Sequence, residues 1–186
     1  MIVALIVLGV VLLIALFFVL IRNSMVASRN RVDESWSGID VQLKRRHDLI
    51  PNLVETVKGY ATHERETFEK VTEARADAMR AVGKGPDAAA SAEAALGGAL
   101  ANLRAVAENY PELRATENFQ QLQRSLSEIE DEIQASRRIY NSNVNSYNTK
   151  IQIFPNSIVA GMGGFTAREF FEISDPTERD PVEVKF

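Results

Sequence analysis

Apolar and polar side chains divide the sequence into an apolar beginning, long stretches with a helical period, and an ending without one. The first stretch, Ile2 to Ile21, has twenty positions, one glycine and no polar side chain. Later, apolar residues recur in steps of three and four, which places them on one stripe of an α-helix. One stripe is Val32, Trp36, Ile39, Leu43, Ile50, Val54, Val57, Ala61, Phe68, Val71, Ala78 and Val82. A second is Phe119, Leu122, Leu126, Ile129, Ile133, Tyr140, Val144, Tyr147 and Ile151.

The apolar run predicts a membrane span. Twenty residues make about 30 Å of helix, enough to cross the hydrocarbon core once. A secretory signal peptide is the alternative, but no Lys or Arg precedes the run, its length exceeds that of a signal h-region, and no small-residue cleavage site follows. We therefore expect a retained single-pass anchor in contact with lipid. Arg22, Arg29 and Arg31 follow it, which favours a cytoplasmic body by the positive-inside rule and leaves the opposite orientation open.

Proline and glycine predict where the helices are interrupted. Pro51 falls inside the first stripe, so we expect a kink or a new helix start there, with Asp48 as a cap. The segment from Gly83 to Pro86 stops the helix, and Asp87 or Ser91 opens an alanine-rich one. Asn109-Tyr110-Pro111 makes the next turn, and a last helix runs from about Glu112 to Ile153.

The predicted fold is all-α: an N-terminal transmembrane helix, an elongated antiparallel helical bundle, and an irregular C-terminal tail. Residues 1–22 form the anchor, 23–154 the bundle and 155–186 the tail. The tail has glycines at 161, 163 and 164, which predict a flexible joint. The aromatic residues that follow are expected to dock on the bundle, with a neighbouring subunit or the lipid surface as the alternative.

Composition narrows the classes of function. The sequence holds 25 acidic and 21 basic residues, a formal charge of −4, which gives no general field for nucleic acid, and we expect no nucleic-acid partner. The absence of cysteine excludes disulfides, thiolate metal sites and a thiol nucleophile. Only two histidines are present, which argues against a zinc enzyme.

Candidate catalytic patterns fail on spacing. His63-Glu64 would need a second histidine at position 67 to bind zinc, and that position is Thr67. A di-metal carboxylate site needs Glu-x-x-His pairs, which the sequence lacks, so a solvated acidic face is favoured for Glu64, Glu66, Glu69 and Glu73. The glycines near Gly161 lack the Gly-Lys-Ser/Thr ending of a phosphate loop. We expect neither an enzyme nor a metal or other cofactor.

Two groups of residues are candidates for binding. Lys44, Arg45 and Arg46 could hold anionic lipid headgroups. They lie roughly 35 Å beyond the span in a straight helix, so internal pairing with acidic residues is slightly preferred. Candidates for protein interaction are Trp36, Ile39, Leu43, Phe165, Phe170 and Phe171. An amide-rich face near Asn141 to Asn148 is expected to bond to another helix or copy, with solvent exposure equally favoured.

Several segments carry a family resemblance. Residues Trp36 to Ala61 (WSGIDVQLKRRHDLIPNLVETVKGYA) resemble the LemA family of bacterial membrane proteins. Further similar segments, in order and with ordinary spacing, are Thr72–Ala76, Tyr110–Ala115, Glu117–Phe119, Arg137–Asn141, Tyr147-Asn148, and Phe154-Pro155 through Phe165 to Phe170-Phe171. His47 stands where members commonly have tyrosine. The resemblance implies an N-terminal membrane helix and a helical bundle, and brings no established activity or catalytic residue set.

These observations favour a structural function. We expect a non-enzymatic scaffold, anchored in the bacterial inner membrane, that assembles with copies of itself and organises or remodels the membrane. A monomeric adaptor that recruits a membrane protease or signalling partner is the alternative.

Overall fold

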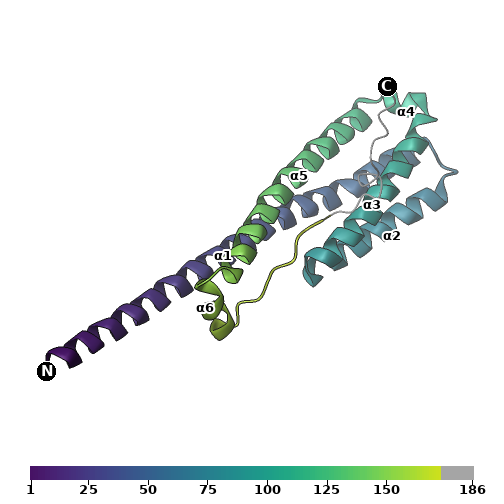
Figure 1. Ribbon diagram of the computed structural model, residues 1–186. Helices are drawn as coiled ribbons and strands as arrows, with labels where there is room; N and C mark the ends of the chain where they lie inside the picture. The colour runs from purple at the N-terminus through teal and green to yellow at the C-terminus, as the bar shows by residue number, and fades with distance from the viewer. Residues whose placement is uncertain (173–186) are drawn as a thin grey trace, which may run out of the picture. The chain divides into compact units, whose positions relative to one another are not determined.

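The structure is a computed structural model that describes residues 1–172, and helices dominate it (Figure 1). In chain order the elements are α1 (Ile2–Lys58), α2 (Arg65–Ala81), the 3-10 helix η1 (Val82–Lys84), α3 (Pro86–Glu108), α4 (Pro111–Ala115), α5 (Glu117–Gln152) and α6 (Asn156–Gly163). No strand occurs within residues 1–172, so the all-α prediction is confirmed.

The described chain forms two compact units, and α1 and α5 each contribute to both. The first unit contains Met1–Ser37 and Arg138–Glu169. The second contains Gly38–Arg137, together with the described residues from Phe170 on. We describe the first as the membrane-proximal unit, because it includes the apolar run, and the second as the core unit.

The core unit is built on the two predicted stripes. Its buried apolar cluster takes residues from α1 to α5: Ile50, Leu53, Val54, Val57, Ala61, Phe68, Val71, Ala78, Leu96, Leu100, Leu103, Ala107, Leu113, Phe119 and Leu126. Steps of three and four therefore marked the buried face correctly on α1, α2 and α5. The alanines of α3 are part of the same arrangement, since Ala89 is fully buried and Ala90 almost so.

The new helix start at Pro51, one of the two expected outcomes, is absent, which corrects that part of the prediction. Helix α1 runs through Pro51, and Asp48 lies inside the helix rather than at a cap. A proline at this position removes the amide that would bond to the carbonyl of His47, four residues earlier. That carbonyl instead accepts a hydrogen bond from Arg75 Nε of α2, at 2.7 Å. A side chain from another helix thus takes the place of the missing donor.

The other boundaries follow glycine, proline and one threonine. The stop at Gly83 to Pro86 is confirmed, since Gly85 adopts a φ of 112° and α3 begins with Pro86. The turn before Pro111 is confirmed as well, but the last long helix begins at Glu117. Thr116 has extended backbone (ψ 136°) that separates α4 from α5, and its hydroxyl accepts from the Phe119 amide at 3.4 Å.

The start of the predicted irregular tail contains a helix, α6, which the sequence analysis missed. Val159 and Ala160 of α6 are buried. After α6 the chain turns at Gly164, whose φ of 65° favours glycine, into an extended segment. Gly163 is required as well, because a Cβ there would lie 2.7 Å from the Phe165 ring.

Candidate functional site

The apolar run at the start of α1 exposes its side chains along its whole length. Leu12, Leu16 and Leu20 are 61%, 55% and 58% exposed. Within residues 1–172, α1 is the one helix that is long and apolar enough to cross a membrane. Exposed side chains of this kind in a continuous run indicate an environment of hydrocarbon rather than water.

Beyond the run, α1 and α5 form an antiparallel pair in the membrane-proximal unit. Asn143 Nδ2 donates to the Arg31 carbonyl at 3.5 Å, and Lys150 Nζ donates to the Ser24 carbonyl at 3.4 Å. From the first contact to the second, α5 advances by seven residues while α1 goes back by seven, so the antiparallel register is the same at both. Buried side chains fill the interface: Met25, Val32, Tyr140, Val144, Tyr147 and Ile151.

The pair carries an extended segment, residues 165–169, that follows α6. The Tyr140 hydroxyl donates to the Glu169 carbonyl at 2.9 Å, and the Tyr147 hydroxyl donates to the Thr166 carbonyl at 3.1 Å. The Asn148 carboxamide contacts both backbone groups of Arg168, accepting from its N–H at 2.8 Å and donating to its C=O at 2.9 Å. A carboxamide used in this way replaces a neighbouring β-strand.

Charged and aromatic contacts fix the same segment. Arg168 pairs with Asp33 at 3.0 Å, and the Arg29 guanidinium lies 5.7 Å from the centre of the Phe165 ring. The expectation that the chain around Phe165 docks on the protein's own helices therefore agrees with the structure. The amide-rich face of α5 is used in part within the chain. Asn143 and Asn148 donate to backbone carbonyls of α1 and of the extended segment, while Asn145 is exposed.

The Tyr147 phenol is protonated at neutral pH and keeps this hydrogen bond. Burial raises its pKa, while Arg168 and Arg29 act in the lowering direction. The Tyr147 hydroxyl therefore remains a donor to Thr166 across the physiological range.

The core unit holds a second polar arrangement, an ionic cluster in which Arg46, His47 and Glu93 are buried and Glu130 is partly exposed. The Arg46 Nη1 atom lies 3.3 Å from Glu93 Oε2 and 3.5 Å from Glu130 Oε2. His47 Nε2 lies 2.7 Å from Glu93 Oε1, the distance of a hydrogen bond in which the ring N–H donates. The Glu93 side chain is fully buried, and those of Arg46 and His47 are each 4% exposed.

This cluster links helices of the core unit to one another. Arg46 Nε and Glu93 Oε2 are buried without a hydrogen bond of good geometry, so the pair depends on charge attraction in a site that excludes water. The cluster joins α1 to α3 and α5, and Arg75 adds α2 through the His47 carbonyl. The sequence reasoning missed Glu93, whose signal is that it is the one charged residue between Asp87 and Arg104 in the alanine-rich part of α3.

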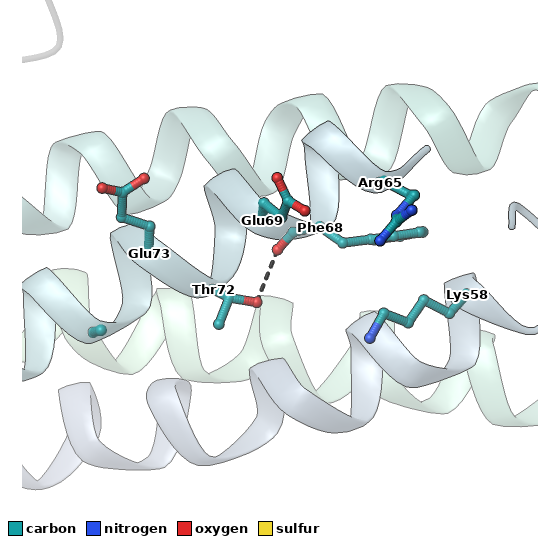
Figure 2. Close-up of a pocket in the computed structure, with 7 residues that line it drawn as sticks. Lys58, Arg65, Phe68, Glu69, Thr72 and Glu73 are labelled. Carbon is teal, nitrogen blue, oxygen red and sulfur yellow. Dashed lines mark hydrogen bonds between the residues drawn. The ribbon is translucent and has the colours of Figure 1, made fainter. Parts of the chain in front are cut away.

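The largest recess described in the core unit lies between the end of α1 and the start of α2 (Figure 2). Its volume is about 610 Å³, and Phe68 lies between Lys58 and the carboxylates of Glu69 and Glu73. The Lys58 ammonium is 5.9 Å from the centre of the Phe68 ring. Thr72 donates its hydroxyl proton to the Phe68 carbonyl, and no histidine lines the recess, so its lining residues provide no activated nucleophile.

The structure separates the predicted lipid-binding residues. Lys44 and Arg45 are exposed, and Arg45 donates to Gln42 at 3.4 Å. Arg46 is buried in the ionic cluster, which agrees with the slightly preferred expectation of internal pairing and not with the alternative of lipid contact. The physical reason is helical geometry, because Arg46 lies three residues after Leu43 on the buried face.

The predicted interaction residues are divided in the same way. Ile39, Leu43 and Phe171 are fully buried within the chain, which corrects the expectation that they are available to a partner. Trp36 is half-buried and its ring centre lies 5.4 Å from that of Tyr140. Phe165 is half-buried beside Arg29, and Phe170 is 36% exposed.

No group of three or more potential metal ligands occurs in residues 1–172. His63 is exposed in the turn before α2, and His47 is bonded to Glu93. The described residues thus bring together apolar surface, backbone hydrogen bonds and one ionic cluster.

Comparison with known proteins gives related sequences with the same family assignment. A model described as the LemA family matches residues 35–186. Magnetosome protein MamQ 2 of Paramagnetospirillum magneticum is 27% identical over 195 residues, covering 91% of this chain and 72% of that protein. Magnetosome protein MamQ of Magnetospirillum gryphiswaldense is 25% identical over 173 residues, covering 80% and 64% of the two chains. Protein LemA of Metamycoplasma hominis is 28% identical over 143 residues, covering 75% and 63%. None of these names is that of an enzyme, and with the apolar helix they fit a membrane-associated protein.

A substitution in the ionic cluster tests its role. Glu93→Gln leaves the buried Arg46 without its nearest counter-charge, so we expect the free energy of unfolding to fall by about 3–5 kcal/mol. The measurement is chemical denaturation of the detergent-solubilised chain, followed by circular dichroism. Glu108→Gln, at an exposed position of α3, is the matched control and should stay within about 0.5 kcal/mol of the parent. Equal stability of the two variants would contradict the assignment.

The raised pKa of Tyr147 predicts a loss of stability in base. A folded-state pKa above the unfolded value means that the folded protein retains a proton that the unfolded chain releases. This contribution is fully present below the unfolded pKa of about 10 and is lost as pH rises through the folded-state pKa. Tyr147→Phe should therefore show a shallower decline in unfolding free energy above about pH 10. Parallel declines in parent and variant would count against burial as the cause.

Proposed function

Because the chain belongs to the LemA family, we propose that it is a non-enzymatic, membrane-anchored helical scaffold that assembles with copies of itself and organises the membrane. The observation that carries the proposal is α1. One unbroken helix contains both the uncharged run Ile2–Ile21 and the buried residues Ile39, Leu43 and Ile50 of the core unit. The apolar run and these buried residues therefore belong to one helix.

Surface chemistry supports assembly rather than catalysis. On α1, Val41 is 56% exposed although it lies next to the buried stripe, so it is the apolar side chain that this part of the helix offers to a partner. Confinement to a membrane raises the effective concentration of copies, so that a small apolar contact is enough for association. The described recess and ionic cluster supply no nucleophile with an activating base.

Mass and shape test self-assembly. We expect the full-length protein, extracted in mild detergent, to form a uniform symmetric particle by light scattering and electron microscopy. Val41→Asp should lower the particle mass, because it places a charge in an apolar contact. Asn52→Asp adds a charge at an exposed polar position of the same helix and should retain the mass. A monomeric parent protein would contradict the scaffold and favour an adaptor, whose partner could then be sought by cross-linking in cells.

Orientation is a separate part of the proposal. Basic residues at positions 22, 29 and 31 follow the span, so we place the body in the cytoplasm of a bacterium, on the inner face of its cytoplasmic membrane. A reporter enzyme that is active only outside the cytoplasm, fused after Phe186, should be inactive. The same reporter should gain activity when Arg22, Arg29 and Arg31 are replaced by glutamine, if these charges set the orientation. Activity in the unsubstituted fusion would reverse the assignment.

A further inference from the structure

A cluster of exposed apolar side chains lies at the end of α5 and in α6. We call it the α6 patch: Ile153, Phe154, Ile158 and Met162, which are 51%, 80%, 55% and 74% exposed. Ile158 and Met162 are four residues apart, so they share one face of α6. The buried Val159 and Ala160 are also apolar, so α6 has apolar side chains on both its inner and its outer side. The first turn of α6 holds the polar residues Asn156 and Ser157, and a short helix with an exposed apolar face and polar residues at one end suits a membrane interface.

The sequence around α6 is free of charge. From Ile151 to Ala167 no acidic or basic residue occurs, and the run is bordered by Lys150 and Arg168. Basic residues at the edges of an apolar segment are typical of the membrane interface, where they meet lipid phosphates. Arg22, which directly follows the apolar run of α1, is exposed as well.

The register of α1 and α5 places the patch at the end of the apolar run. Asn143 bonds to Arg31, and Lys150 bonds to Ser24. Three residues beyond Lys150 is Ile153, and three residues before Ser24 is Ile21, the last residue of the run. The antiparallel register therefore brings the start of the patch to the level of Ile21, and α6 follows at this end of α5 (Figure 1).

Two exposed apolar surfaces therefore reach the same level of α1. The first is the side of α1 formed by residues such as Phe17 and Leu20, which are 55% and 58% exposed. The second is the α6 patch, which begins at the level of Ile21 of α1. If α1 crosses the bilayer, the α6 patch lies at the bilayer surface. The exposed apolar area of the patch then favours its transfer from water into the boundary between headgroups and acyl chains.

We propose that α6 is a second membrane contact, an interfacial helix whose patch inserts into the headgroup and acyl boundary of the leaflet where α1 leaves the bilayer. Phe154, Ile158 and Met162 enter the lipid, while Val159 and Ala160 face the protein. Lys150, whose ammonium bonds to Ser24, lies at the α5 border of the inserted segment, at the level of the headgroups. The inference rests on the proposed anchoring by Ile2–Ile21, and its test separates the two.

The absence of cysteine in the natural chain makes a single-cysteine series direct. Ile158→Cys and Met162→Cys carry a polarity-sensitive fluorophore on exposed positions, so packing is unaffected. Leu12→Cys reports on the span. Ile139→Cys is the matched control, because Ile139 is 60% exposed and lies on α5 about 21 Å from the level of Ile153. Each full-length variant is reconstituted into phosphatidylcholine–phosphatidylglycerol vesicles, and its circular dichroism spectrum is compared with that of the parent.

Two quenchers distinguish lipid from water and from protein. At positions 158 and 162 we expect blue-shifted emission, strong quenching by a nitroxide near the glycerol end of the acyl chain, and several-fold weaker quenching by iodide than at position 139. Position 12 should respond more strongly to a nitroxide near the methyl end.

Other outcomes overturn the inference. If positions 158 and 162 respond to iodide as position 139 does, while position 12 is quenched by lipid, the patch lies in water and only the second contact is wrong. If they are shielded from both quenchers, protein covers the patch and lipid does not. If position 12 is itself accessible to iodide, the proposed anchoring fails and the interfacial helix fails with it.

Discussion

The backbone hydrogen-bond ladder of α1 is the constraint on which the other contacts depend. A segment without charge, such as Ile2–Ile21, is stable in hydrocarbon only if its amides and carbonyls bond to one another, and an α-helix achieves this within one segment. Here the same ladder continues to Lys58. The membrane-proximal unit packs on the residues up to Ser37, and the core unit uses those from Gly38 on. Both units are thus assembled along the helix that contains the apolar run.

The two units satisfy their polar groups by different means. In the membrane-proximal unit, neutral side chains such as Tyr140, Tyr147 and Asn148 bond to the backbone of an extended segment. In the core unit, Arg46 and Glu93 are buried as charges. Buried ion pairs contribute little net stability, because the loss of hydration offsets their attraction, but they disfavour every packing that would separate them. The ionic cluster therefore selects one alignment of α1 against α3 more than it stabilises the fold.

Much of the fold could be predicted from the sequence, because helical periodicity follows directly from burial. Positions such as Ile39, Val57 and Ile133 were assigned to buried stripes, and they are fully buried. Glycine and proline also marked the ends near Gly85 and Pro111. Each of these signals depends on residues that are close together in the sequence.

The errors have a common physical origin in contacts between distant residues. Internal pairing was preferred for Arg46, but its partners Glu93 and Glu130 lie far along the chain and could not be named from the sequence. Helix α6 has too few residues for a period to be read, and the docking of residues 165–169 depends on side chains of α5 about twenty positions away. The hydrogen bond that Arg75 donates to the His47 carbonyl, beside Pro51 in α1, likewise joins residues of different helices.

That last feature reverses the usual part played by proline in a helix. An alanine at position 51 would return an amide to the carbonyl of His47, and this amide would compete with Arg75 for the same oxygen. Because proline has no amide proton, the His47 carbonyl has no donor within its own helix and accepts from the Arg75 guanidinium of a neighbouring helix. A residue known for ending helices here serves as the attachment point by which one helix is joined to the next.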